Sequence, residues 1–189
     1  MSRLDLVVGP NGAGKTTFVR LVLTPTLPPG TPFVNADEIA KTRWPGREAE
    51  QSYEAARIAA DTRDALIRTQ RPFVAETVFS HPSKLELIDA ALAAAFTVKL
   101  HVLLVPLAVC LARVPARVAH GGHAVPREKI GQRYERLWPL VAEAIARADG
   151  ADVWDNSSRR PVQVAEYIGG LGVSTPRWPN WTPEPLRCL

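Results

Sequence analysis

A glycine-rich segment close to the N-terminus carries residues whose types and spacing suit phosphate chemistry. Gly9 to Thr16 fit the pattern G-x-x-x-x-G-K-[ST] without a mismatch, between an apolar run and a helical one. Glycines let backbone amides point at phosphate oxygens, and the helix N-terminus adds a partial positive charge. Lys15 would bridge the β- and γ-phosphates, and the Thr16 hydroxyl would hold Mg²⁺. The pattern favours a nucleotide site over a glycine turn with a chance lysine, and it predicts that ATP or GTP is bound by Gly9, Asn11, Gly12, Ala13, Gly14, Lys15, Thr16 and Thr17.

Two carboxylates follow predicted strands, where the ligands of open parallel sheets bind. Asp37 comes after the strand at residues 33–34, and Glu76 after the strand at 73–75. One could accept the proton of an acceptor hydroxyl, and the other could hold Mg²⁺ or grip acceptor hydroxyls. The segment from Asn35 to Glu38 also fits a helix cap with acidic first-turn residues, so position alone leaves both interpretations of Asp37 open.

Basic residues and a glycine-hinged segment in the second half of the chain predict a lid. Arg113 and Arg117 are four residues apart and would share one face of a continuous helix. Residues 119–123 contain two glycines between two histidines, which suits a hinged segment. His120 and His123 lack nearby cysteines or a clear third ligand, so the pattern favours exposed or lid histidines over a zinc site.

A second group of cations, which includes Arg133 and Arg136, lies beside the apolar stripe of the next predicted helix, at the rim of the core. A solvated basic face paired with Glu128 and Glu135 is the alternative, and periodicity alone slightly favours it. The predicted lid spans residues 113–136, and its candidate contacts are Arg113, Arg117, His123, Arg133 and Arg136. Asn156 follows the last predicted strand, where a loop can contact the nucleotide base, although a plain turn explains it equally well.

The elements that must position these residues alternate between strand and helix. Strands are predicted at 4–8, 33–34, 73–75, 98–105 and 151–154, with helices at 15–23, 48–69, after Pro82, after Pro106 and around 130–141. This order predicts an α/β fold of the P-loop NTPase or kinase type, a parallel five-stranded sheet flanked by helices, with a lid. The kinase domain would span residues 1–171.

The tail at 172–189 contains Trp178, Trp181 and four prolines, which exclude a regular helix or a central strand. We expect a strap that packs its tryptophans onto the domain, and the alternative is a binding segment for a protein partner.

Composition indicates which class of ligand the protein binds and in which compartment it lies. The chain has 189 residues and a net charge of +4, without dense Lys/Arg runs, which favours a phosphate-rich small ligand over nucleic acid. Cys110 and Cys188 imply no disulfide or zinc framework. No long apolar stretch opens the chain, and the longest one, at 98–111, is too short to span a membrane. The sequence therefore predicts a cytoplasmic protein.

The ordered motifs resemble those of the zeta-toxin family of kinases, and its short branch most of all. The matching segments are residues 9–17, 34–37, 76–80, 117–126, 133–134 and 155–157. The resemblance implies transfer of the γ-phosphate to a sugar hydroxyl of UDP-N-acetylglucosamine, by a toxin that has a protein antitoxin. It implies that Asp37 is the catalytic base, that Lys15 and Arg117 act on the phosphate, and that the substrate contacts are Asn35, Glu76, Thr77 and Ser80.

The sequence departs from the family in three respects. His123 stands where longer members carry a lid arginine, Pro115 interrupts the helix that carries Arg117, and the chain is shorter than the large toxins. Two other interpretations therefore stay open. One is a nucleoside, nucleic-acid-end or antibiotic kinase on the same fold. The other is a non-catalytic nucleotide-dependent interaction module, against which the carboxylates at two strand ends count.

Overall fold

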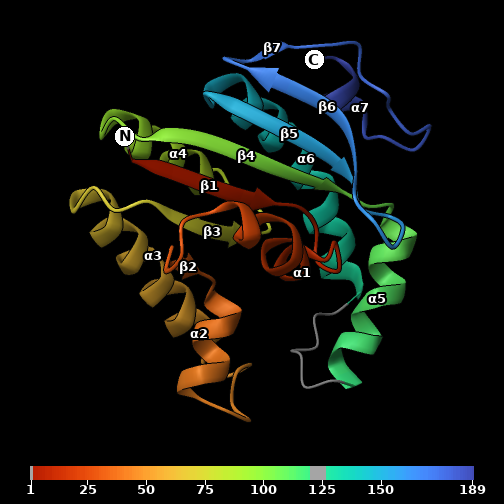
Figure 1. The fold of residues 1–189 in the computed structure, drawn as a ribbon. Helices are drawn as coiled ribbons and strands as arrows, with labels where there is room; N and C mark the ends of the chain where they lie inside the picture. The colour runs from red at the N-terminus through yellow and green to blue at the C-terminus, as the bar shows by residue number, and fades with distance from the viewer. Residues whose placement is uncertain (1, 120–126) are drawn as a thin grey trace.

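The structure is a computed structural model that describes residues 2–119 and 127–189, with the backbone alone at 114–119 and 127. Its centre is a seven-stranded sheet in the order β2-β3-β1-β4-β5-β6-β7 (Figure 1). The first five strands in that order are parallel, and β6 and β7 are antiparallel. The strands are β1 (Arg3–Val8), β2 (Phe33–Val34), β3 (Phe73–Thr77), β4 (Thr97–Leu104), β5 (Gly150–Asp155), β6 (Val162–Ile168) and β7 (Leu171–Gly172).

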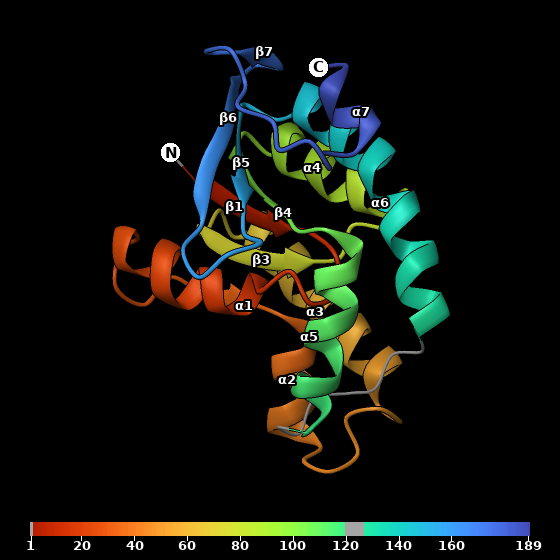
Figure 2. The ribbon, with the colours of Figure 1, turned by 90° about the vertical axis from the view of Figure 1, so that its right-hand side faces the viewer.

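Helices connect the parallel strands, and one short helix follows the last strand. They are α1 (Lys15–Phe18), α2 (Ala36–Arg43), α3 (Ser52–Arg68), α4 (Ser83–Ala93), α5 (Leu107–Ala119), α6 (Arg127–Arg147) and α7 (Glu184–Arg187). A π-helical turn (η1, Val19–Leu23) and a 3₁₀ turn (η2, Thr24–Thr26) extend α1. Figure 2 shows α4, α6 and α7 on one side of the sheet and α1 on the other. None of the helices in the described ranges is long and apolar enough to cross a membrane.

Two apolar cores lie on opposite faces of the sheet because its central strands alternate their side chains. On one face, Leu4, Leu6 and Val8 of β1 pack with apolar residues of α3, α4 and α6. On the other, Val7 packs with residues of α1, η1 and α5, including the buried Cys110. The phosphate-binding segment follows β1 directly, so both cores fix the point from which it starts.

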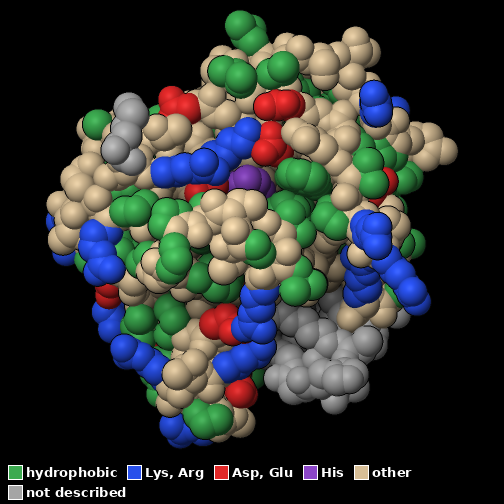
Figure 3. Space-filling view, viewed as in Figure 1, with side chains coloured by type: hydrophobic (Ala, Val, Ile, Leu, Met, Phe, Trp, Pro, Cys, Tyr) green, Lys and Arg blue, Asp and Glu red, His purple; other side chains and the backbone are tan. Residues whose placement is uncertain are grey.

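A charged network occupies the α1 face of the sheet. His101 of β4 hydrogen-bonds through Nε2 to Asp5 Oδ1 at 2.8 Å, and both residues are buried. Lys99 pairs with Asp152 of β5 at 2.7 Å. Burial raises the pKa of Asp5, but hydrogen bonds from His101 and Arg3 outweigh it and the net pKa is lowered. Figure 3 shows charged side chains and a histidine gathered on this face, where Figures 1 and 2 draw no helix over β4 and β5.

The C-terminal segment runs back over the α6 side of the molecule. Trp178 and Trp181 pack against the larger core, and Leu186 of α7 is fully buried in it. The amide of Arg177 also donates to the carbonyl of Val164 at 2.7 Å. The C-terminal segment therefore packs onto the domain as the expected strap. Its helix, α7, has only four residues.

The predicted α/β fold with a helix-flanked parallel sheet is confirmed. All five predicted strands are present, and β6 and β7 lengthen the sheet by two antiparallel strands that the sequence did not suggest. The helix expected from residue 48 begins at Ser52, and a separate helix, α2, precedes it. Residues 120–126, with His120, His123 and the centre of the predicted lid, lie outside the described residues.

Candidate active site

The phosphate-binding segment forms a tight loop between β1 and α1. Gly12 has φ = 81°, a conformation that side chains disfavour, and a Cβ there would lie 2.8 Å from the Cys110 carbonyl oxygen of α5. Lys15 is 7% exposed, and its Nζ donates to the carbonyls of Gly9 at 3.0 Å and Pro10 at 3.1 Å. The loop therefore has the backbone and the buried lysine that a phosphate site requires.

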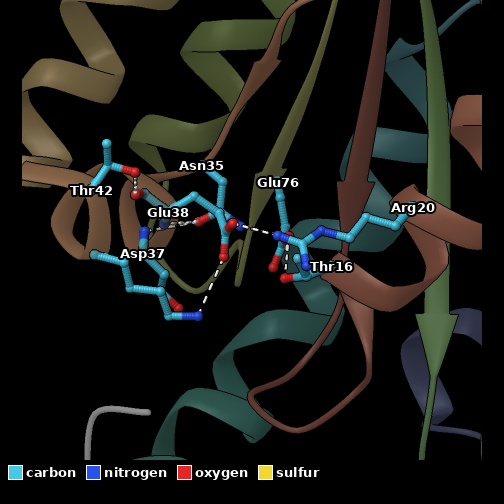
Figure 4. Close-up of polar contacts among 8 residues, drawn as sticks. Thr16, Arg20, Asn35, Asp37, Glu38, Thr42 and Glu76 are labelled. Carbon is cyan, nitrogen blue, oxygen red and sulfur yellow. Dashed lines mark hydrogen bonds and ion pairs between the residues drawn. The ribbon is translucent and has the colours of Figure 1, made fainter. Parts of the chain in front are cut away.

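A hydrogen-bonded triad joins this loop to two strand ends (Figure 4). Glu76 Oε2 accepts from Thr16 Oγ1 at 2.8 Å and from Asn35 Nδ2 at 2.7 Å. The three residues meet because β3 lies between β1 and β2 in the sheet, so the carboxyl ends of all three strands share one edge. The sequence suggested each residue separately, and the direct bond between Thr16 and Glu76 was not expected.

Asn35 caps the helix that carries Asp37. Its Oδ1 accepts from the amides of Asp37 at 2.8 Å and Glu38 at 3.4 Å. The capping function thus belongs to Asn35, and Asp37 is the second residue of α2, with an exposed side chain. Glu38 is held by ion pairs to Arg20 at 2.5 Å and Lys41 at 3.3 Å. Asp37 is therefore the acidic residue of this turn that faces the cleft described next.

A cleft of about 310 Å³ opens beside the loop, between α2, α3, the β3–α4 connection and α6. Its volume falls within the range of small-molecule sites. Among the sequence-predicted residues, the cleft brings together Asn11, Lys15, Asn35, Asp37, Glu76, Thr77, Ser80 and Arg133. Ser52 and Lys84 also line it, and sequence reasoning missed both, because their positions depend on how α3 and α4 pack.

The β3–α4 connection turns sharply beside the carboxylate. Phe79 is fully buried at φ = 61°, a left-handed conformation that non-glycine residues rarely adopt. Its amide donates to Thr77 Oγ1 at 3.4 Å, and His81 Nδ1 lies 2.9 Å from Ser83 Oγ. Backbone strain of this kind gathers at ligand sites, and here Phe79 lies between Thr77 and Lys84, which both line the cleft.

A second hollow, of about 430 Å³, lies on the other side of the loop. Phe18, Val22 and Pro161 give it apolar walls, and Thr17 and Asn156 line it as well. Asn156 Nδ2 donates to the Ala13 carbonyl at 2.6 Å, so the β5–β6 connection is attached to the phosphate loop. The hollow has the size and the mixed lining to hold a nucleoside whose phosphates enter the loop.

The predicted lid cations occupy different places. Arg113 holds loops together, because its guanidinium donates to the carbonyls of Gly12, Asn156 and Ser157 at 3.4, 3.1 and 2.9 Å. Arg136 is exposed and donates to the Gln132 carbonyl of its own helix. Arg117 belongs to α5, but its side chain and all of His123 lie outside what the structure describes.

Cys110 is a packing residue, as its apolar surroundings in the sequence predict. It is fully buried beneath the loop, and burial raises the pKa of its thiol to about 11. Burial likewise raises the pKa of Tyr134 to about 12, and its hydroxyl donates to the Val105 carbonyl at 3.1 Å. No group of three or more potential metal-ligating side chains occurs among the residues that the structure covers.

Several solved structures share this fold. The AvrRxo1-ORF1:-ORF2 complex with ATP superposes with a TM-score of 0.69 at 18% identity, over 91% of this chain and 60% of that one. The PezAT toxin–antitoxin system of Streptococcus pneumoniae gives 0.58 at 11% identity, over 86% and 70%. Shikimate kinase from Acinetobacter baumannii, in complex with shikimate, gives 0.52 at 19% identity, over 76% and 80%.

At these identities the likeness is one of fold, and the fold is that of the P-loop kinases. The chain spans about 60% of the length of the AvrRxo1-ORF1:-ORF2 chain it matches. None of the curated proteins matches the sequence. A profile of the AAA_33 family of AAA domains matches residues 4–140, which is more than half of the chain. The chain therefore belongs to the AAA_33 family of AAA domains.

Proposed function

We propose that the protein is a kinase that transfers the γ-phosphate of ATP or GTP to a hydroxyl of a small metabolite. The observation that carries this proposal is the triad of Thr16, Glu76 and Asn35, which opens on the same cleft as Asp37. A phosphate loop alone serves many reactions. A loop joined by hydrogen bonds to a strand-end carboxylate, beside a cleft with a second carboxylate, supports transfer to an acceptor in that cleft.

The residues present fit a magnesium ion with the nucleotide. Thr16 Oγ1 and Glu76 Oε2 are hard oxygen donors 2.8 Å apart, at the end of the loop where the β- and γ-phosphates would lie. Thr16 would hold the ion, with Glu76 beside it directly or through water. When bound, Mg²⁺ would neutralise charge on the phosphate oxygens.

The acceptor hydroxyl would attack the γ-phosphorus while the bond to the β–γ bridging oxygen breaks. Asp37 would accept the hydroxyl proton, because its carboxylate faces the cleft from the first turn of α2. Lys15 would stabilise the negative charge that develops on the transferred phosphoryl group. Arg133 lines the same cleft and would add positive charge there. Arg117 is proposed to act from α5. Asn35, Thr77 and Ser80 would contact the acceptor, and Asn156 the nucleotide.

We further propose UDP-N-acetylglucosamine as the first acceptor to test, and a toxin that is restrained by a protein antitoxin as the biological role. The motif resemblance supports both, and two proteins of similar fold were solved as AvrRxo1-ORF1:-ORF2 and as a PezAT toxin–antitoxin system. Gel filtration of the protein with the product of an adjacent small gene tests the partner.

Labelled ATP tests the proposed function directly. The protein is incubated with Mg²⁺, γ-labelled ATP and either UDP-N-acetylglucosamine or a bacterial metabolite extract, and new phosphorylated species are identified by mass spectrometry. Asp37→Asn should lower transfer by about 10²–10⁴-fold, the usual contribution of a positioned base, and leave ATP affinity nearly unchanged. Asp61→Asn on α3 is the matched control, because Asp61 is exposed and pairs only with Arg57 among the described residues.

Equal loss of binding and transfer in Asp37→Asn would contradict the assignment of Asp37 as base. A complete absence of labelled product across a broad set of acceptors would favour the non-catalytic interaction module instead.

A further inference from the structure

One arginine of α5 contacts both of the loops that border the nucleoside hollow. Arg113 donates from Nη1 to the carbonyl of Gly12, in the phosphate loop, at 3.4 Å. The same guanidinium donates to the carbonyls of Asn156 and Ser157, at the start of the β5–β6 connection, at 3.1 and 2.9 Å. One half-buried side chain therefore joins two segments that are distant in the sequence.

The position of Arg113 follows from the packing of α5 against the phosphate loop. A Cβ at Gly12 would lie 2.8 Å from the carbonyl oxygen of Cys110, so the helix and the loop are in direct contact. Arg113 follows Cys110 by three residues and thus lies on the same side of α5. Its guanidinium carries five N–H donors in one plane, which suits it to several carbonyls at once.

Further hydrogen bonds hold the start of the β5–β6 connection. The amide of Asn156 donates to the Leu104 carbonyl of β4 at 2.9 Å, and its Nδ2 donates to the Ala13 carbonyl at 2.6 Å. The phosphate loop has its own internal bonds from Lys15. Together with Arg113, these bonds fix the separation between the two loops.

A nucleotide would have to contact both loops at once. Its phosphates would enter the phosphate loop, and its nucleoside would occupy the hollow, which is lined by Gly14 from one loop and by Arg159 and Pro161 from the other. A ligand that bridges two subsites binds tightly only when their separation matches its own length. Loops that the protein already holds in place also lose little conformational freedom when the ligand binds.

We propose that Arg113 is a positioning residue for the nucleotide, which acts by holding the phosphate loop and the β5–β6 connection at the separation that the ligand requires. The sequence pattern predicts a different role, that of a lid cation on the phosphates. The inference rests on the proposed nucleotide site and does not depend on the acceptor. Because Arg113 also lines the hollow, its test must distinguish positioning from direct contact with the nucleoside.

The experiment compares a ligand that spans both loops with one that reaches the phosphate loop alone. ATP and inorganic triphosphate displace a fluorescent ATP analogue from the full chain in the presence of Mg²⁺, which gives both dissociation constants. The test variants are Arg113→Met and Arg113→Lys, and the latter keeps the positive charge but replaces the planar fork with a single nitrogen. The matched control is Arg57→Met on α3, whose side chain is exposed and borders neither the hollow nor the cleft.

ATP should bind Arg113→Met about 5–30-fold more weakly, the cost of ordering the backbone of one further residue on binding. Inorganic triphosphate should bind Arg113→Lys almost as it binds the wild type, whereas ATP should bind this variant more weakly. Transfer at saturating ATP should keep its rate while the KM for ATP rises. In the unliganded Arg113→Met variant, hydrogen exchange should be faster at the amides of residues 156–160.

Equal weakening of ATP and triphosphate in Arg113→Lys would assign Arg113 to the phosphates and overturn the inference. Unchanged hydrogen exchange in unliganded Arg113→Met would mean direct contact with the nucleoside and would overturn it as well. So would ATP binding equal to that of the wild type. If thermal unfolding shows that Arg113→Met is not folded, Arg113→Lys carries all of these measurements. A wild-type chain that binds ATP but phosphorylates no acceptor would refute the proposed function and leave the positioning role intact.

Discussion

Asn35 makes two separable contributions, and three substitutions distinguish them. As a helix cap it satisfies the amide of Asp37 at 2.8 Å, and as a donor it satisfies Glu76 at 2.7 Å. Asn35→Ala removes both. The lost cap costs about 1 kcal/mol. The lost hydrogen bond to a carboxylate costs about 1.5–3 kcal/mol, nearer the lower end because Glu76 is partly exposed.

The summed loss is about 2.5–4 kcal/mol, which lowers the melting temperature of a chain of this size by about 5–16 °C. Asn35→Ser keeps a capping hydroxyl but cannot reach Glu76, so it should lose only the second contribution. Asn35→Asp keeps the cap and places a second carboxylate against Glu76. Two such charges 4 Å apart repel by roughly 4 kcal/mol at an effective dielectric constant of 20, and solvent reduces this at a half-exposed residue.

The pH dependence of Asn35→Asp has a defined sign. Repulsion from Glu76 raises the folded-state pKa of the introduced carboxyl above its unfolded value of about 4. The destabilisation is therefore complete near pH 7 and shrinks as the pH falls through the raised pKa, because one proton removes the repulsion. Differential scanning calorimetry from pH 4.5 to 7.5 measures this. A pH-independent deficit for Asn35→Asp, or an Asn35→Ala variant as stable as wild type, would refute the assigned contacts.

Two further predictions concern the C-terminal strap and the buried thiol. Leu186→Ala should lower stability by about 2–5 kcal/mol, because Leu186 is fully buried, whereas Leu189→Ala, at 44% exposed, should change the melting temperature little; equal effects would mean that α7 does not belong to the core. Iodoacetamide at pH 8 should modify the exposed Cys188 and spare Cys110, whose pKa is raised to about 11, until the protein is denatured, and mass spectrometry of the peptides would reveal any labelling of native Cys110.

The sequence was informative wherever one short pattern determines a structure. The loop at Gly9–Thr16 fixes a strand before it and a helix after it, and β2 was located at its observed residues, 33–34. The antiparallel strand β6 was not predicted. Its burial follows no strict alternation, and a register shift at Val153/Trp154 interrupts its pairing with β5. The order of apolar and polar residues along the chain therefore gives little indication of this strand.

Contacts between distant elements could not be read from the chain. The bond from Thr16 to Glu76 depends on β3 lying next to β1, and Lys84 reaches the cleft through the turn at Phe79. The hydrogen bonds that cap α2 could not be assigned from the sequence either. The sequence left Asp37 between an acidic first-turn residue of a capped helix and a catalytic base, and the observed bonds show that Asn35 is the cap. Composition and periodicity carry no information on which of two neighbouring polar residues makes a given hydrogen bond.

The bonds from Lys15 to its own loop make nucleotide binding an exchange reaction. An ammonium has three N–H donors, and two of those on Nζ already bind carbonyls, so a phosphate oxygen that replaces either carbonyl exchanges one acceptor for another. Only the difference between the two partners appears in the enthalpy of association. In return, the same bonds hold the loop in its curved conformation, so little conformational entropy is lost when phosphate binds. Nucleotide binding should therefore release less heat, and lose less conformational entropy, than binding to a loop without these two lysine bonds.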